Sequence, residues 1–458
     1  MIKDPIYALA EHVAGTSIGD ISDDAITAAK IFILDTLGVG ISGSSGPMAS
    51  ELVAAMRAMG TGGDAHVWCT GELLPACNAA LCNAYMAHCQ EYDCVHEGAV
   101  AHVMTCVLPA ALAVAQRQGG VTGARLLEAV ILGVDVAASL GLAASSGLRF
   151  FRPGTVGAFG GVAAAGKILE FDAAWLVEAF SIAYGQVGGT MQAHTEGSGL
   201  LAMQMAFNAR NAVTAVDLAA AGFTGPHNIL TGDFGYFRLI EGGGDPKAVI
   251  ARLGKDWLIT GVAHKPFPSG RATHGILDGC LRLQHEHRFA ASDIAEIKLT
   301  VPPLIQHLVG RPPKTQMAIN YARLCARYVL ACAMHGGGIG LSDFTLEAYL
   351  RADRQDLAER TRMVVQDDGD PNALVPIGVA ITLKDGTKLH TRVEHVYGSP
   401  ENPMTRDAHL AKFRQNCWDG TNPLPRSQVD DLIGLCDDLH ALPNIDALLL
   451  GLTHMTPG

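Results

Sequence analysis

The sequence predicts a mainly α-helical protein that carries one smaller α+β region. Within residues 1–263 the apolar positions recur with helical spacing, and almost no segment alternates with period two. Alternating segments begin near residue 294, and helical patterns return after Pro403. With 458 residues, 49% of them hydrophobic, the chain has enough length and apolar material for two or three domains around a large core.

The N-terminal part is expected to be a succession of helices. Ser22 is a suitable N-cap, and Asp23 and Asp24 place acidic side chains in the first turn of the helix that follows. The expected helices span residues 5–15, 22–40, 48–59, 75–92, 105–118, 122–142, 173–187 and 202–221, with a short extended piece at 66–71 and loops at 149–161 and 190–199.

The later part mixes helices with strands. The turn Lys384-Asp385-Gly386-Thr387 lies between two alternating segments, which is typical of a β-hairpin. The expected strands span residues 294–302, 362–367, 375–386 and 387–396, and the expected helices span 273–285, 317–334, 343–357, 405–416, 426–438 and 441–451. We infer a first helical part at 1–263, an α+β domain at 264–403, and C-terminal helices at 404–458 that rejoin the helical domain.

Composition excludes several classes of protein. The net charge of −12 argues against a nucleic-acid binder, because neutralising phosphates requires a basic face. The eleven cysteines form no C-x-x-C pair, and several lie in apolar helical runs, which is typical of buried reduced thiols. The N-terminus lacks a signal-peptide layout, and the apolar stretches are interrupted before about 18 residues. We therefore expect a cytoplasmic protein without a membrane span.

Acid and base groups are concentrated between Asn83 and Pro109. A general base needs a pKa near the working pH, which histidine has without much tuning, and a nearby aspartate can orient its ring. Asp93, His96 and His102 are the candidate catalytic residues here. The alternative is a set of surface or capping residues at a helix end, which is the role we assign to His88. The reactive side chains of this stretch are His88, Glu91, Asp93, Cys94, His96, Glu97 and His102.

A second candidate group lies in HKPFPSGRATH at 264–274. Two prolines fix the backbone, and a helix is expected to open shortly after Gly270. A helix N-terminus with Lys265 and Arg271 nearby could bind a carboxylate or phosphate. The alternative is an interdomain linker with solvated charges.

Further candidates lie on Gly-rich segments. Arg152, before Pro153, could meet an anion, and His194 and Glu196 could line a pocket. The glycines of 38–46 follow a helix rather than a strand, so they are no dinucleotide fingerprint. Histidines and carboxylates are also metal ligands, but no H-E-x-x-H or comparable spacing is present, so we expect neither a metal nor another cofactor.

Five segments, spread over nearly the whole chain, carry a resemblance to a known family. They are KIFILDTLGVGISGS (30–44), NAYMAHCQEYDCVHEGAVAHVMTCVLPAALAVAQ (83–116), HKPFPSGRATHGILDG (264–279), ARLCARYVLACAMHGG (322–337) and VYGSPENPMT (396–405). Together they resemble the MmgE/PrpD family, which includes 2-methylcitrate dehydratase, cis-aconitate decarboxylase and iminodisuccinate epimerase.

The resemblance implies a fold and a site. It implies a large helical domain built from both chain ends, a smaller α+β lid domain, an active site between them, and a homodimer. By position, Asp93, His96 and His102 match the family's acidic-and-histidine segment. Lys265 matches its lysine, and Tyr328 matches its active-site tyrosine.

The sequence also departs from the family pattern. Cys94 stands where members often have aspartate, and Gly270 replaces a cysteine. Arg152 stands where the decarboxylase-like members have a histidine. Gln204 replaces the histidine of a lysine-and-histidine segment whose lysine is also missing. The loss of a histidine and a lysine from a carboxylate pocket disfavours cis-aconitate decarboxylation.

The function implied by the resemblance starts with removal of a proton α to a carboxylate. We therefore expect a cofactor-independent, dehydratase-like lyase acting on a small hydroxy-carboxylic or polycarboxylic acid. His102, oriented by Asp93, is the expected base. The alternatives are an isomerase or epimerase of a dicarboxylate, a decarboxylase, and a non-catalytic carboxylate-binding homologue.

The remaining roles follow from the same resemblance. Lys265, with Arg271 or Arg152, is expected to hold a substrate carboxylate, and Gln204 to contribute to substrate binding. Tyr328 or His96 is expected to return a proton to the leaving hydroxyl or to carbon. The expected partners are a small carboxylate and a second copy of the chain.

Overall fold

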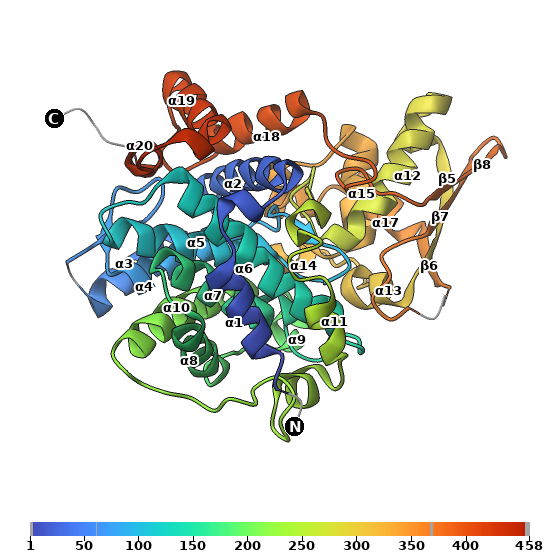
Figure 1. Ribbon diagram of the computed structural model, residues 1–458. Helices are drawn as coiled ribbons and strands as arrows, with labels where there is room; N and C mark the ends of the chain where they lie inside the picture. Colours follow the sequence, from blue (N-terminus) through green and yellow to red (C-terminus); the bar gives the residue numbers. More distant parts are fainter. Residues whose placement is uncertain (1–2, 61, 367–369, 454–458) are drawn as a thin grey trace.

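The computed structural model describes residues 3–60, 62–366 and 370–453, and it is mainly α-helical, as predicted (Figure 1). Ser22 accepts a hydrogen bond from Ala25 N, so the predicted N-cap is confirmed. The first helices are α1 (Ile6–Gly15), α2 (Asp23–Gly43), α3 (Ala49–Met59), α4 (Ala76–His88), α5 (Val103–Arg117), α6 (Gly123–Ala143), α7 (Arg152–Ile168), α8 (Ala173–Tyr184), α9 (Met191–Glu196) and α10 (Leu200–Ala220).

Helices α4, α5, α6, α7 and α10 pack against one another to form the centre of this part. Small residues allow the close approach: a Cβ atom at Gly133 of α6 would lie 2.8 Å from the carbonyl oxygen of Gly160 of α7. Helices α2 and α6 are long and apolar enough to cross a membrane by length and composition, but 78% and 94% of their apolar windows are buried inside the protein. Such burial is what core helices show.

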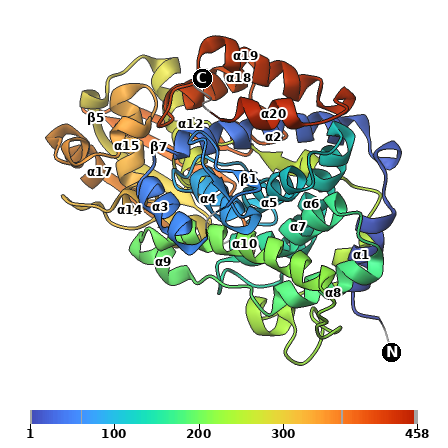
Figure 2. The same cartoon turned by 90° about the vertical axis from the view of Figure 1, so that its left-hand side faces the viewer.

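The α+β part lies at one end of the molecule (Figures 1 and 2). Its sheet has the strand order β6-β5-β7-β8, in which only the β5–β6 pair is parallel. The predicted hairpin is confirmed: β7 and β8 pair antiparallel, and Gly386 has a φ of 91° in the turn. The strands are β5 (Ile294–Val301), β6 (Thr361–Val365), β7 (Ile377–Leu383) and β8 (Lys388–Val393).

Helix α12 packs against β7 and β8 on one side and against α15 on the other. Residue 367, the last of the strand predicted at 362–367, lies outside the described residues. The later helices are α11 (Pro246–Ala251), α12 (Arg271–His287), α13 (Pro303–Val309), α14 (Ile319–Arg323), α15 (Ala326–Gly336), α16 (Leu346–Tyr349), α17 (Ala352–Glu359), α18 (Arg406–Trp418), α19 (Arg426–Asp437) and α20 (Asp446–Gly451).

The C-terminal helices lie over the N-terminal part of the chain. Figures 1 and 2 both show α18 and α19 beside α2, and α20 contacts α5. Gly38 of α2 makes room for Phe413 of α18, because a Cβ there would lie 2.6 Å from the phenyl ring. The domain boundaries at 263/264 and 403/404 remain predictions.

The buried apolar side chains form two clusters. One joins α1–α8 and α10 with the C-terminal helices, and the other fills the α+β part. Ala84 of α4, Cys106 of α5 and Phe151 belong to the second cluster although they come from the helical part. The two clusters therefore meet beside the end of α4 and the start of α5.

Several boundaries differ from the predicted ones. Helix α4 ends at His88 rather than near residue 92, because Glu91 adopts a left-handed backbone with φ 54°. The predicted loop at 149–161 already contains the start of α7, and the predicted loop at 190–199 contains α9, which Gly197 ends at φ 71°. The region predicted to be all-helical also contains the two-residue strands β1 (Ala65–His66), β2 (Leu73–Leu74), β3 (Val95–His96) and β4 (Val262–Ala263).

The other differences are interruptions of predicted helices. The segment 317–334 divides into α14 and α15 because Cys325 is extended and pairs with Gly310. The segment 343–357 divides into α16 and α17. The helix predicted from 441 begins only at Asp446, after Pro443, which has no backbone N–H to continue a helix.

Candidate active site

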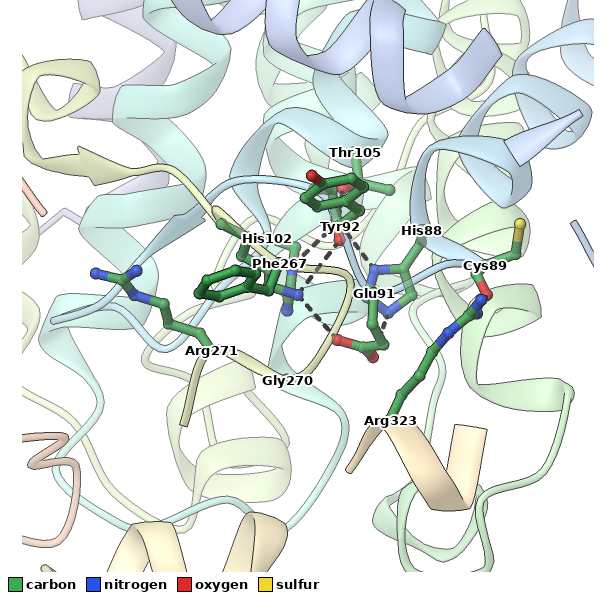
Figure 3. A network of polar contacts seen from close by, with 12 residues as sticks. His88, Cys89, Glu91, Tyr92, His102, Thr105, Phe267, Gly270, Arg271 and Arg323 are labelled. Carbon is green, nitrogen blue, oxygen red and sulfur yellow. Dashed lines mark hydrogen bonds and ion pairs between the residues drawn. The ribbon is translucent and has the colours of Figure 1, made fainter. Parts of the chain in front are cut away.

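The end of α4 and the start of α5 place two histidines on one aspartate. Asp93 is completely buried, and its Oδ2 lies 2.9 Å from His88 Nδ1 and 3.0 Å from His102 Nδ1. Thr105 Oγ1 donates a hydrogen bond to the same oxygen at 2.5 Å. Because α4 stops early, the chain can turn back and bring Asp93 between the two rings. Figure 3 shows His88, His102 and Thr105 gathered at this point.

His88 is therefore not the bystander that the sequence suggested. Its ring is buried, donates to Asp93, and lies edge-on to the His102 ring with centroids 4.7 Å apart. Its Nε2 lies 3.6 Å from Glu91 Oε1. The helical register explains the error: His88 is in the last turn of α4, where a terminal histidine is usually solvated. We call His88, Glu91, Asp93, His102 and Lys265 the site cluster.

Lys265 provides the positive charge of this cluster. Its side chain is completely buried, with Nζ 2.9 Å from Glu91 Oε2 and 3.6 Å from Asp93 Oδ1. Lys265 follows β4, which pairs antiparallel with β3. This pairing places the lysine next to the acidic stretch. Burial raises the pKa of Glu91, but the charges of Lys265, His88 and His102 together outweigh this effect and lower that pKa to about 2.

The two histidines have opposite pKa shifts. Burial lowers the pKa of His102, despite the opposing charge of Asp93. Burial also acts on His88, but there Asp93 and Glu91 outweigh it and raise the pKa. For Asp93 the penalty of burial is overcome by His102, His88 and Lys265, which hold its pKa well below the usual range. His102 is thus kept neutral and able to accept a proton, while His88 favours the charged form.

The site cluster borders a hollow of about 70 Å³. Its polar wall consists of Glu91, His102, His194 and Arg271, and the rest is largely apolar. Residues 270–272, the N-terminus of α12, also line it. That helix has no side-chain N-cap, so its first N–H groups and its dipole favour an anion in the hollow.

Arg271 lies at the edge of the hollow with most of its donors occupied. Its Nε donates to Glu97 Oε1 at 2.7 Å, and its Nη1 donates to the carbonyl oxygens of His264 and Tyr397, each at 2.9 Å. In Figure 3, Arg271 and Arg323 lie on opposite sides of Glu91. Of the predicted carboxylate-binding residues, Arg271 alone is in the wall of the hollow.

The other predicted binding residues have partners elsewhere. Arg152 is buried and forms an ion pair with Glu241, with Nη2 to Oε2 at 2.9 Å. Gln204 Oε1 accepts from Thr190 N at 2.6 Å, in a separate hollow beside Arg210. Neither residue lines the hollow beside His102.

Two predicted proton donors also lie outside its wall. His96 Nδ1 accepts from Ala99 N at 3.2 Å, and burial lowers its pKa to about 4. Tyr328 is buried in the α+β core, where its hydroxyl donates to the carbonyl oxygen of Asp343 and its ring meets Tyr349. Among the described residues, the structure thus joins Asp93, His102 and Lys265 but leaves His96 and Tyr328 apart.

A second buried group of similar composition lies between α2 and α18. Lys412 Nζ lies 2.7 Å from Asp35 Oδ1, and the His264 and His409 rings lie 4.9 Å apart. We call Asp35, His264, His409 and Lys412 the closed cluster. In each cluster an aspartate and two histidines could hold a metal ion. In each, however, a lysine ammonium already neutralises the carboxylate, and a divalent cation would have to compete with it.

Three charged residues near the hollow were given no role by sequence reasoning. Glu91 belongs to the acidic stretch but had no assigned function. Arg323 Nη1 donates to Cys89 O at 2.6 Å while its Nε is buried without a partner. Arg311 Nη2 donates to His194 O at 2.9 Å while its Nη1 has none. The sequence signal for Arg323 was its position in the segment at 322–337; Arg311 had none.

The chain matches the models of one protein family along most of its length. The family model of the MmgE/PrpD N-terminal domain matches residues 7–249, and that of the MmgE/PrpD C-terminal domain matches residues 267–429. The cis-aconitate decarboxylase of Homo sapiens is 26% identical over 467 residues, covering 98% of this chain and 94% of that protein. The cis-aconitate decarboxylase of Aspergillus terreus is 26% identical, covering 90% and 89%. The cis-aconitate decarboxylase-like protein oryM of Aspergillus oryzae is 27% identical, covering 89% of each.

Proposed function

The chain belongs to the MmgE/PrpD family, and we propose from this premise that it is a lyase that removes a proton α to a carboxylate of a small hydroxy-polycarboxylic acid. The observation that carries the proposal is the position of His102, whose Nδ1 lies 3.0 Å from the buried Asp93 Oδ2 and which lines a hollow together with the N-terminus of α12. The relatives of the chain that are named above act on a polycarboxylic acid, as their names state.

His102 is the proposed base. Its Nδ1 faces Asp93, which fixes the ring and stabilises the imidazolium that forms after proton transfer. The other ring nitrogen is then the one available to a substrate. A base held neutral by burial can accept a proton at neutral pH without first losing one.

The developing negative charge needs stabilisation close to the carbon that loses the proton. We place the substrate carboxylate at the N-terminus of α12, because residues 270–272 line the hollow and the helix dipole favours an anion there. Lys265 lies behind Glu91 and provides a further positive charge. These groups would hold the enolate-like state that precedes loss of the β-hydroxyl.

The proton donor to the leaving hydroxyl is assigned to the imidazolium of His102. The predicted donors His96 and Tyr328 are absent from the wall of the hollow, so the proposal does not require them. One residue acting first as base and then as acid suffices when the proton and hydroxyl leave from the same side.

Decarboxylation is the second candidate, favoured by the apolar lining of the hollow. Val95, Val100, Phe151, Met191 and Leu324 face the space beside His102. A carboxylate held against such residues is poorly solvated, and loss of CO2 relieves that cost. The relatives named as cis-aconitate decarboxylases support the same candidate.

The remaining alternatives differ in the fate of the substrate. An isomerase or epimerase would use the same base without expelling a group, and a non-catalytic homologue would bind carboxylates without changing them. Closure of the α+β part over the hollow would exclude water in each enzymatic case. The presence of two apolar clusters, one in the helical part and one in the α+β part, supports such a movement of one part relative to the other. The homodimer and the cytoplasmic location stay predictions.

A panel of di- and tricarboxylates in D2O, followed by proton NMR, tests the proposal. We expect an alkene proton to appear as a hydroxy acid is consumed, with no release of CO2. Release of CO2 would establish decarboxylation instead. Solvent deuterium in a recovered hydroxy acid of inverted configuration would establish epimerisation. Unchanged substrates that still raise the melting temperature would identify a binder.

A further inference from the structure

Glu91 separates Lys265 from the hollow. Lys265 is 0% exposed and is absent from the wall, whereas Glu91 belongs to it. Because Lys265 Nζ lies 2.9 Å from Glu91 Oε2, the Glu91 carboxylate is paired with the ammonium on the side that faces the hollow. A substrate carboxylate could reach this ammonium only if Glu91 moved.

The backbone of Glu91 is strained. Its φ of 54° is left-handed, a region that non-glycine residues rarely adopt. Its N–H donates to the carbonyl oxygen of His88 at 2.9 Å, which ties the turn to the end of α4. Non-glycine residues held in this way cluster at ligand sites and switches. The strain gives the side chain a fixed starting position next to Lys265.

Arg323 is a buried cation on the side of Glu91 opposite Arg271 (Figure 3). Arg323 is 3% exposed, and its Nε has no hydrogen-bond partner. Within the described ranges, neither Arg323 nor Arg311 has a carboxylate within ion-pair distance. Both guanidinium groups lie close enough to Glu91 to interact with its charge. Buried cations of this kind favour an approaching anion.

The charges around the hollow also leave room for an anion. The cations are Lys265, Arg271, Arg311 and Arg323, and the carboxylates are Glu91, Asp93 and Glu97. Four positive and three negative charges leave an excess of one positive charge among these groups, before any charge on His88 is counted. Arg323 and Arg311 carry the excess, since neither has an acidic partner in the part of the chain that the structure describes.

We propose that Glu91 is an internal competitor for the substrate: it holds Lys265 in the unliganded protein and yields it to a substrate carboxylate by turning towards Arg323. The inference rests on the proposed function, since it takes the hollow to be the carboxylate site. Glu91 thereby becomes a determinant of specificity. The chain itself provides both the competing ion pair and the cation that receives the displaced carboxylate.

The competition selects the class of substrate. A tethered carboxylate acts at a high effective concentration, so a free monocarboxylate displaces it poorly. A ligand that already binds the N-terminus of α12 through one carboxylate presents its second carboxylate to Lys265 at a similarly high effective concentration. The substrate should therefore carry at least two carboxylates.

Calorimetric binding of succinate and butanoate tests the inference without requiring turnover. For the wild type we expect succinate to bind at least tenfold more tightly than butanoate. In Glu91→Gln both ligands should bind at least tenfold more tightly than they bind the wild type, and the gap between them should narrow. In Glu91→Gln/Lys265→Met the gain should vanish. Equal or weaker binding to Glu91→Gln would overturn the proposal.

Two further variants keep the test decisive. Glu128→Gln is the matched control, because Glu128 is a buried glutamate that pairs with Arg125 at 3.1 Å and with Lys167 at 3.8 Å and does not line the hollow. It should leave succinate binding unchanged. Arg323→Gln should weaken succinate binding in the wild type but not in the Glu91→Gln background. An equal loss in both backgrounds would show a structural role and overturn the proposal.

The binding data also separate this inference from the proposed chemistry. If no acid in the panel is turned over but Glu91→Gln gains affinity through Lys265, the chemistry fails and the competitor stands. If turnover is observed and Glu91→Gln gains nothing, the competitor fails and the chemistry stands. Melting curves of each variant establish that the compared proteins are folded.

Discussion

The site cluster and the closed cluster share three types of side chain in different arrangements, and the site cluster also contains Glu91. Each has one buried aspartate, two histidines and one lysine. In the site cluster both histidines lie against Asp93, at 2.9 and 3.0 Å, and the lysine is shared with Glu91. In the closed cluster the lysine lies 2.7 Å from Asp35 Oδ1, and the His264 and His409 rings lie 4.9 Å apart.

The pKa values of the histidines follow from this difference. Burial lowers the pKa of His264 to about 3 and also lowers that of His409, because Lys412 already compensates Asp35. In the site cluster the acids outweigh burial at His88, so its pKa rises. Composition alone therefore does not make a catalytic group. The partner of the carboxylate and access to the hollow decide it.

The largest contrast is expected from the histidines. His102→Asn should lower kcat by about 10³-fold, since it removes the base. His409→Asn, its counterpart in the closed cluster, should turn over substrate nearly as the wild type does. Steady-state kinetics and melting curves of both variants check this. Equal losses in the two variants would remove the distinction between the clusters.

Substitution of the two lysines should have different effects, on substrate binding for Lys265 and on folding stability for Lys412. Lys265→Met should raise KM by about 10- to 100-fold, the loss expected for a charge-assisted contact. Lys412→Met should leave KM unchanged but destabilise the fold by about 3–5 kcal/mol, because Asp35 becomes an unpaired buried charge. Denaturant titration and initial rates measure the two effects. An unchanged KM in Lys265→Met would assign the anchoring to Arg271 and the helix N-terminus.

The pH dependence of activity should report His102. Its pKa is lowered, so the neutral base persists below the ordinary histidine value of about 6.5. We expect kcat/KM to hold as the pH falls through 6.5 and to decline only below it. A decline centred above 6.5 would identify a different base.

The closed cluster should affect the pH dependence of folding stability rather than that of activity. Folded His264 keeps a pKa of about 3, whereas the unfolded chain binds that proton near pH 6.5. Between these values the unfolded state holds more protons, so stability is full above pH 6.5 and falls as the pH drops towards 3. Melting temperatures between pH 7 and 4 should therefore fall less steeply in His264→Asn than in the wild type. Parallel curves would contradict this.

The smallest effect is expected at Tyr328. Its hydroxyl is bonded to the carbonyl oxygen of Asp343, away from both clusters. Tyr328→Phe should therefore change kcat little while lowering the melting temperature slightly. A loss of kcat approaching that of His102→Asn would show that the tyrosine reaches the substrate, as the family resemblance implied.

Local patterns made much of the architecture predictable. Helical periodicity and caps such as Ser22 depend on residues a few positions apart, and the Asp-Gly turn of the hairpin is equally local. The concentration of acid and base groups between α4 and α5 was visible for the same reason. Asp93 and His102 could be selected because histidine chemistry needs a carboxylate close by in the chain or in space.

What the sequence determined by itself was the helical class, the α+β part and the segment that contains the proposed base. Only the tertiary structure decided which charges meet. It joined Lys265 to Glu91 across 174 positions and Lys412 to Asp35 across 377, and it drew Arg152 to Glu241. An ion pair depends on which helices pack together, and several cations compete for each buried carboxylate. The same competition decided the contacts of His88 and Glu91, and no rule of sequence spacing predicts those contacts.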